Sequence, residues 1–159
     1  MKTNAMLLIR VSGEIESERA GLEKLMSEFH DLPHVDESYI LRAKASIFHD
    51  FYTAVERTMR LIAEELNGGV PKGEQWHKQL LVDMTLDLED LRPPVFSKEL
   101  FERVLPFLRF RHLFRTMYGY ELKADRIRAL EDDFPALVGA VNAALDLFYA
   151  WLKRTAAIG

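Results

Sequence analysis

Apolar residues recur every three or four positions from Ser38 to Leu66. This spacing matches one face of an α-helix and does not match the alternation of a β-strand. The segment that follows contains Asn67, Gly68 and Gly69, which tolerate positive φ, and Pro71, which cannot continue a helix, so the helix is predicted to end there. The apolar positions are Ile40/Leu41, Ala45, Ile47/Phe48, Phe51/Tyr52, Val55, Met59, Ile62 and Leu66.

Four other segments show helical spacing and have recognisable limits. Ser97 is a predicted N-cap and Gly119 a predicted stop, and Pro106 is expected to distort the helix between them. Pro135 marks either a kink in the last helix or its true beginning. No segment alternates as a strand does, and no internal repeat is found. We therefore predict an all-α bundle of about five helices in one domain over residues 1–159, with the further helices at Ser17–Phe29, Glu74–Leu88, Ser97–Tyr118 and Ala124–Ala156.

The composition fits one globular core and excludes several kinds of chemistry. The 159 residues include 48% hydrophobic and 29% charged side chains, which is typical of a soluble domain. The chain has no cysteine, which excludes a disulfide framework, a thiolate metal site and a cysteine nucleophile. No apolar run approaches the ~18 residues that cross a bilayer, and no signal peptide is recognised. These features predict a cytoplasmic protein without a membrane segment.

Charge is distributed unevenly along the chain. Residues 97–128 hold eight basic and four acidic side chains, whereas the rest holds thirteen basic and twenty-one acidic ones. No carboxylate interrupts the stretch between Glu102 and Glu121. Because the whole chain has a net charge of −4, a uniformly basic nucleic-acid binder is unexpected, but this stretch predicts a local site for a polyanion.

The common enzyme signatures are absent: there is no dinucleotide or Walker loop, no GxSxG elbow and no HExxH pair. His30 and His34 have the spacing of two metal ligands on a helix, but Pro33 lies between them and no third ligand is evident. Neither a metal nor a cofactor is predicted.

The helix that contains the basic stretch has two cationic edges beside an apolar stripe. Arg111 and Tyr118 are seven residues apart and fall in register, with Arg115 next to them. Arg109, His112 and Thr116 fall on the other side. The alternative interpretation is structural: the arginines cover core edges with their stems buried and their heads in water.

The run from Arg111 to Leu122 resembles the signature of the HepT-like toxins of the HEPN superfamily, an arginine followed after four to six residues by a histidine, one residue and a tyrosine. Residues 47–52, 73–77 and 92–94 also look like this family, and the likeness spans Ser38 to the C-terminus. The resemblance implies an all-α homodimer with a shared cleft that cleaves RNA without a metal. It further implies a minimal nucleotidyltransferase as antitoxin, which in some systems adenylylates the motif tyrosine.

On this resemblance, Arg111 matches the motif arginine and Tyr118 the motif tyrosine, whereas Thr116 stands where the motif has histidine. Threonine does not titrate near pH 7 and cannot replace an imidazole as general acid or base, although it can hydrogen-bond a phosphate or a water. His112, one turn earlier, is the nearest stand-in and could approach the partner's Arg111 across a dimer. Arg109 and Arg115 are the expected RNA-binding residues.

Three functions therefore remain open at the level of sequence. The first is a toxin, or a toxin-derived protein, with an RNA-directed cleft. The second is a non-catalytic HEPN module that binds RNA, nucleotide or a partner, which Thr116 favours. The third is an unrelated helical bundle with an accidental motif.

Overall fold

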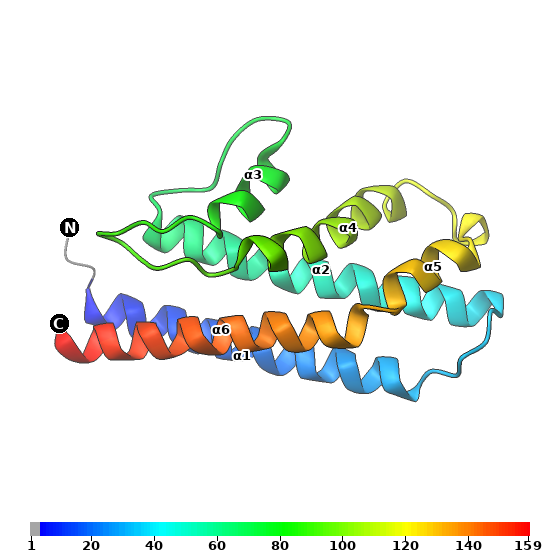
Figure 1. Ribbon diagram of the computed structural model, residues 1–159, viewed down its shortest axis with the longest axis horizontal. Coiled ribbons are helices and arrows are strands. Elements are labelled where there is room, and N and C mark those ends of the chain that lie inside the picture. Colours follow the sequence, from blue (N-terminus) through cyan, green and yellow to red (C-terminus); the bar gives the residue numbers. More distant parts are fainter. Residues whose placement is uncertain (1–3) are drawn as a thin grey trace.

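The computed structural model describes residues 4–159, which form an antiparallel bundle (Figure 1). Its long helices run alternately up and down, with α1 and α6 in one layer and α2 and α4 in the other. Two short helices, α3 and α5, lie against the α2–α4 layer and at the start of α6. The elements are α1 (Ala5–Asp31), α2 (Ser38–Leu66), α3 (Trp76–Asp83), α4 (Lys98–Phe114), the 3₁₀ turn η1 (Gly119–Glu121), α5 (Ala124–Glu131) and α6 (Phe134–Ile158).

This architecture confirms the predicted all-α class, and the part of the chain that is described contains no strand beyond an isolated bridge between Leu88 and Arg92. The bounds of α2 are those predicted. Its end is also as predicted, since Gly68 and Gly69 have φ of 84° and 141°, and the Gly69 amide donates to the Ala63 carbonyl.

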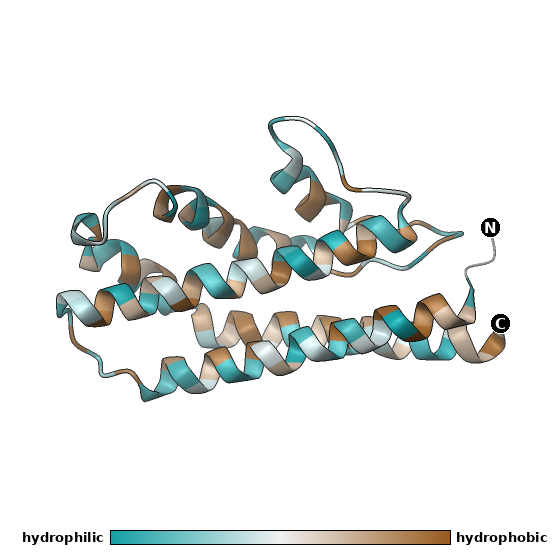
Figure 2. Ribbon diagram, turned by 180° about the vertical axis from the view of Figure 1, so that it is seen from behind, coloured by the Kyte–Doolittle hydropathy of each residue, from teal (hydrophilic) through white to brown (hydrophobic). Residues whose placement is uncertain are grey.

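The first predicted helix is longer than the sequence indicated, since α1 begins at Ala5 and not at Ser17. Leu8, Val11 and Ile15 extend the buried stripe of Leu22 backwards by nearly four turns. In Figure 2 such apolar residues recur as brown bands along α1 and α2. The Asn4 side chain caps the helix by accepting from the Met6 amide at 2.9 Å.

The third predicted helix is shorter than expected, because α3 covers Trp76–Asp83 and not Glu74–Leu88. Arg92 explains its early end. The buried Arg92 guanidinium donates to the carbonyls of Asp83 at 2.8 Å and Leu86 at 3.2 Å. These carbonyls at the end of α3 therefore have a partner without a further helical turn.

In α4, Ser97 is the predicted N-cap, and its hydroxyl accepts from the Leu100 amide at 3.0 Å. The helix continues through Pro106 but ends at Phe114, four residues before the predicted Tyr118. Its last turn tightens, since the Thr116 amide and hydroxyl both donate to the Leu113 carbonyl, at 3.1 and 3.0 Å. Tyr118 therefore does not continue the α4 face that carries Arg111.

The last predicted helix is two helices. The helix is interrupted at Asp132 and Asp133, so that Pro135 lies in the first turn of α6. Amide groups in the first turn of a helix have no intrahelical acceptor, so the missing amide hydrogen of proline costs no hydrogen bond there. The sequence left two alternatives for Pro135. The structure confirms that it marks the beginning of a helix, and the alternative that it kinks a longer helix is wrong. The bundle therefore has six α-helices among residues 4–159, one more than the sequence predicted.

The α6 helix alone among the described elements is long and apolar enough to cross a membrane, with a mean hydropathy of 1.3 in its most apolar window. This qualifies the expectation that no segment would approach that length. In the fold, however, α6 lies along α1 (Figure 1). Leu137, Val141 and Leu145 of α6 are fully buried. One face of α6 therefore packs in the core of the bundle, although only 33% of its apolar window is buried.

Phenylalanines from all four long helices meet at the centre of the core. The Phe134 ring lies 4.9 Å from both Phe29 and Phe48, and the Phe107 ring lies 5.3 Å from Phe51. These edge-to-face contacts fix α4 against α2. They thereby set the position of the α4 turn that follows, which carries the predicted site residues.

Candidate functional site

Arg111 points from α4 towards two polar residues of α2. Its Nη1 lies 3.7 Å from Oε2 of Glu56, and its guanidinium carbon lies 5.9 Å from the centre of the Tyr52 ring. Only 13% of the Arg111 side chain and 10% of the Glu56 side chain are exposed. The structural interpretation, with arginine heads in water, does not hold for Arg111, because its Nε and Nη1 atoms are buried.

This arrangement places one positive and one negative charge inside the bundle. Neither Nε nor Nη1 of Arg111 makes a hydrogen bond within residues 4–159, and the same is true of the Tyr52 hydroxyl. Burial, and then the Glu56 carboxylate, raise the pKa of Tyr52, while Arg111 lowers it. Tyr52 is thus a neutral neighbour, and Glu56 is the counter-ion of Arg111.

His77, at the start of α3, is the third group on Glu56. Its Nδ1 lies 3.1 Å from Oε2 of Glu56, and its ring stacks on Trp76 at 3.6 Å. Burial is the largest influence and lowers the pKa of His77. Glu56 opposes this effect, whereas the charges of Arg111 and His112 add to it. The net effect is a lowered pKa, which favours the neutral form of His77.

His112 brings the second imidazole, since its ring lies 5.0 Å from that of His77 at an interplanar angle of 77°. Both rings line a pocket of about 410 Å³ between α3 and α4, which we call the histidine pocket. Arg109 lies on the same pocket, so the structure brings Arg109, Arg111 and His112 into one region. The remaining residues that line it are Glu74, Gln75, Lys78, Leu105 and Leu108.

The other predicted residues lie beyond the end of α4. Thr116 is exposed, and its hydroxyl is engaged with the Leu113 carbonyl. Tyr118 is 67% exposed and stacks on Tyr120, with ring centres 5.5 Å apart and the planes 7° from parallel. Arg115 is exposed at the C-cap. The structure therefore separates Thr116, Tyr118 and Arg115 from the buried Arg111–Glu56 pair.

A cation that the sequence analysis did not select lies at the loop that follows α4. A Cβ on Gly119 would be 2.7 Å from the guanidinium carbon of Arg42, so the Arg42 side chain covers this glycine closely. Arg42 belongs to α2, and its contact docks the loop with Tyr118 and Tyr120, which we call the tyrosine loop, onto the first turns of that helix.

Sequence reasoning missed Tyr52, Glu56 and His77 as a group. One signal was available: Glu56 falls beside Val55 and four residues after Tyr52, at the edge of the apolar stripe of α2, where a carboxylate is rarely buried without a partner. Its partners come from α3 and α4, and that pairing cannot be read from local spacing.

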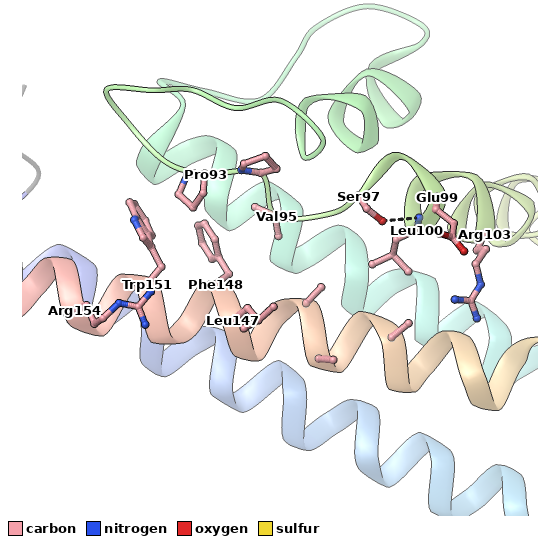
Figure 3. A pocket seen from close by; sticks show the side chains of 14 residues that line it. Pro93, Val95, Ser97, Glu99, Leu100, Arg103, Leu147, Phe148, Trp151 and Arg154 are labelled. Carbon is pink, nitrogen blue, oxygen red and sulfur yellow. Dashed lines mark hydrogen bonds between the residues drawn. The ribbon is translucent and has the colours of Figure 1, made fainter.

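An apolar groove of about 690 Å³ lies on another face, between α6 and the segment that leads into α4. In Figure 3, Pro93 and Val95 face Phe148 and Trp151 across it, with Arg154 at one end and Arg103 at the other. None of the predicted site residues lines this groove.

The two early histidines lie in different parts of the chain's local structure. No group of three or more His, Asp or Glu side chains in residues 4–159 is placed to hold a metal ion. His30 lies in the last turn of α1, whereas His34 lies after the end of that helix, so the two do not share a helical face.

Comparison with known proteins gives one result. The sequence model of a family described as HepT-like protein matches residues 43–152, which run from within α2 to within α6 and include every predicted site residue. No curated protein and no solved structure shows significant similarity to the chain.

Proposed function

Because the chain belongs to the HepT-like protein family, we propose that it is the toxin, or a toxin-derived half, of a toxin–antitoxin pair and a metal-independent endoribonuclease of the cytoplasm. The observation that carries the proposal is the fixed Arg111 cation beside two imidazoles and a basic pocket edge. Such a set can bind a phosphodiester and stabilise the charge that develops on it.

In this function the motif residues and their neighbours have different roles. Arg111 supplies positive charge near the reacting phosphate, and Glu56 keeps its guanidinium in place. The exposed Arg109 and Arg115 attract the RNA backbone. Thr116 cannot move a proton near pH 7, and because its hydroxyl donates to the Leu113 carbonyl, its remaining role is to accept a hydrogen bond from a water.

The direct test is cleavage of an RNA oligonucleotide in the presence of a chelator. The wild-type chain should cleave, and Arg111→Gln should lose activity by about 100-fold or more. Arg111→Lys keeps a charge beside Glu56 and should retain part of the activity. The matched control is Arg126→Gln, because Arg126 is exposed on α5 and lies outside the site. No cleavage by the wild type would contradict the proposal, provided that circular dichroism shows it folded.

Tyr118 is the proposed modification site for a minimal nucleotidyltransferase partner. Its ring is 67% exposed and projects from the loop after α4, which makes the hydroxyl accessible to another protein. Co-expression with such a partner should add adenylyl mass to the wild-type chain and not to Tyr118→Phe. Tyr120→Phe is the matched control, because Tyr120 is also exposed and stacks on Tyr118. Modification of the Tyr118→Phe chain would rule out this site.

The proposed assembly is a homodimer, in keeping with the family. Light scattering coupled to size-exclusion chromatography should give twice the chain mass of 18.4 kDa. A monomer at every concentration from about 1 μM to about 100 μM would contradict the dimer, since a functional homodimer should associate below that range.

A non-catalytic RNA- or partner-binding module is the second candidate, and the observation that favours it is Thr116 in place of the motif histidine. Under this function the wild type binds RNA and does not cleave it. Affinity should fall steeply with salt, and the double variant Arg109→Ala, Arg115→Ala should lower the log–log slope by about 0.7 for each phosphate that is no longer neutralised. Cleavage that appears only in Thr116→His would indicate a site disarmed at this one residue.

A further inference from the structure

The histidine pocket contains a pair of imidazoles that the motif does not include. His77 comes from α3 and His112 from α4, 35 positions apart in the sequence, and their rings lie 5.0 Å apart. Two imidazoles at one site are the usual means of moving two protons near pH 7, because each can be neutral or charged there. The pocket therefore holds the proton-transfer groups that the motif lacks when Thr116 replaces its histidine.

The two histidines are held differently, and the difference assigns their roles. The His77 ring donates from Nδ1 to Glu56, because a carboxylate only accepts, and this fixes the tautomer with a lone pair on Nε2. Only 15% of its side chain is exposed, and Trp76 stacks on the ring. His77 is thus an oriented base, in the manner of an imidazole backed by a carboxylate.

His112 is less constrained than His77. It is exposed, and no hydrogen bond within residues 4–159 holds its ring. With the rings 5.0 Å apart a phosphate does not fit between them as they stand, so binding requires the exposed His112 side chain to turn to the opposite side of the bound group. An in-line displacement needs base and acid on either side of phosphorus, and the turned His112 would meet this requirement.

The rest of the pocket fits a phosphodiester. Lys78 and Arg109 line it from α3 and α4, and Glu74 is its one carboxylate among the described residues. The Arg111 charge lies behind it, close enough to influence His77. A volume of about 410 Å³ is within the range of small-ligand sites.

Resting on the proposed ribonuclease function, we propose that the histidine pocket is the phosphodiester site, with His77 as general base and His112 as general acid. The His77 Nε2 takes the proton of a ribose 2′-hydroxyl, and the 2′-oxygen forms a bond to the adjacent phosphorus. The bond from phosphorus to the 5′-oxygen breaks, and protonated His112 gives its proton to that oxygen. The products are a 2′,3′-cyclic phosphate and a 5′-hydroxyl, and no co-reactant is consumed.

The lowered pKa of His77 supports its role as the base, since the neutral form then dominates at pH 7. Charged or titratable groups face it from both packed elements: Glu56 from α2, and Arg111 and His112 from α4. Lys78 and Glu74 border the same pocket from the α3 side.

The experiment measures RNA cleavage by the full chain carrying His77→Gln or His112→Gln. Each should reduce kcat by about 100-fold or more, and mass spectrometry of the wild-type reaction should find the 2′,3′-cyclic phosphate. The control is His49→Gln, whose side chain pairs with Asp50 and packs on Phe114 outside the pocket, and it should leave the rate within about two-fold. Thermal melts verify that the glutamine variants fold. Rates near wild type in both pocket variants would overturn the proposal while leaving the ribonuclease function intact.

A second measurement keeps the two ideas separate if the wild type does not cleave RNA. Uridine 3′-monophosphate is added to the chain, and the imidazole signals of His77 and His112 are followed by NMR. Shifts of both signals, weakened in Lys78→Ala and absent for His49, would support the pocket as the phosphate site although the ribonuclease function has failed. No shift up to about 10 mM nucleotide, about ten times the concentration that half-saturates a weak site with a Kd of about 1 mM, would overturn the site.

Discussion

Arg92 is a charged side chain that is only 2% exposed, and its role is structural. Its guanidinium donates to the Asn67 side chain and to the carbonyls of Asp83, Leu86 and Pro93. It joins the end of α2, the end of α3 and the segment before α4. A buried cation of this kind is tolerated only because its fork of donors is satisfied.

Arg92→Lys should therefore destabilise the fold even though the charge is kept. A single ammonium cannot reach all the acceptors that lie around the edge of the planar guanidinium, and several carbonyls lose their donor. We expect the free energy of unfolding to fall by about 3 kcal/mol, measured by urea denaturation. Arg126→Lys, on an exposed arginine, should change it by less than about 0.5 kcal/mol. Equal effects of the two substitutions would contradict the structural role of Arg92.

His77 makes stability depend on pH. Its pKa is lowered from 6.5 in the folded chain, so the unfolded chain binds the proton more tightly. The stabilisation is present above pH 6.5 and is lost as the pH falls below that value towards the folded pKa. The groups that face the ring are Glu56, Arg111 and His112, and all belong to α2 or α4.

The expected result is a decrease in the free energy of unfolding between about pH 7.5 and pH 5.5 that is smaller in His77→Gln than in the wild type. His30→Gln, at an exposed position on α1, should follow the wild-type curve. Parallel curves for the wild type and His77→Gln would show that His77 is not protonated differently in the two states.

At the scale of the helix, glycines in α1 and at the end of α2 have opposite roles. Gly13 lies on the exposed face of α1, where a Cβ would meet no atom within 4 Å. Gly68 has a φ of 84° at the C-terminus of α2. Gly13→Ala should raise the free energy of unfolding by about 0.8 kcal/mol, because alanine loses less backbone freedom in a helix.

Gly68→Ala should lower it by about 1 kcal/mol, because a side chain is strained at positive φ. Thermal melts of both variants give the two signs in one comparison. Stabilisation by both substitutions would mean that the turn after α2 adopts another conformation.

Helix identity was predictable because periodicity is local, and helix ends were less so because they depend on distant partners. The bounds of α2 follow from its own stripe and its glycines. The end of α3 is set by Arg92, nine residues after its last helical residue, and the break before α6 by the two aspartates at positions 132 and 133. The α1 stripe continues through Leu8 and Val11, ahead of the predicted start at Ser17.

The candidate site shows the same limit. The motif positions on α4 could be identified from the sequence, and Arg109, Arg111 and His112 do lie together. Glu56 and His77 could not be connected to them, because 55 residues separate Glu56 from Arg111 and only tertiary packing brings them together. That Thr116 and Tyr118 lie off the α4 face follows from a tightened last turn, which spacing does not reveal.

At the scale of the whole molecule, the first and last helices, α1 and α6, bring the two ends of the described chain to one end of the bundle. Leu8, near the beginning of α1, and Ile158, at the end of α6, line the same hollow. Figure 1 shows both helices ending on this side, while the tyrosine loop and the α1–α2 connection lie at the other.

This proximity makes the chain suitable for circular permutation. A short Gly/Ser linker can join the residues after Ile158 to those before Ala5, and new ends can be opened in the connection at residues 32–37. The permuted chain should fold and keep the histidine pocket, because the α1–α6 contact needs adjacency and not a particular chain order. If the permuted chain does not fold, the fold requires the direct covalent connection between α1 and α2.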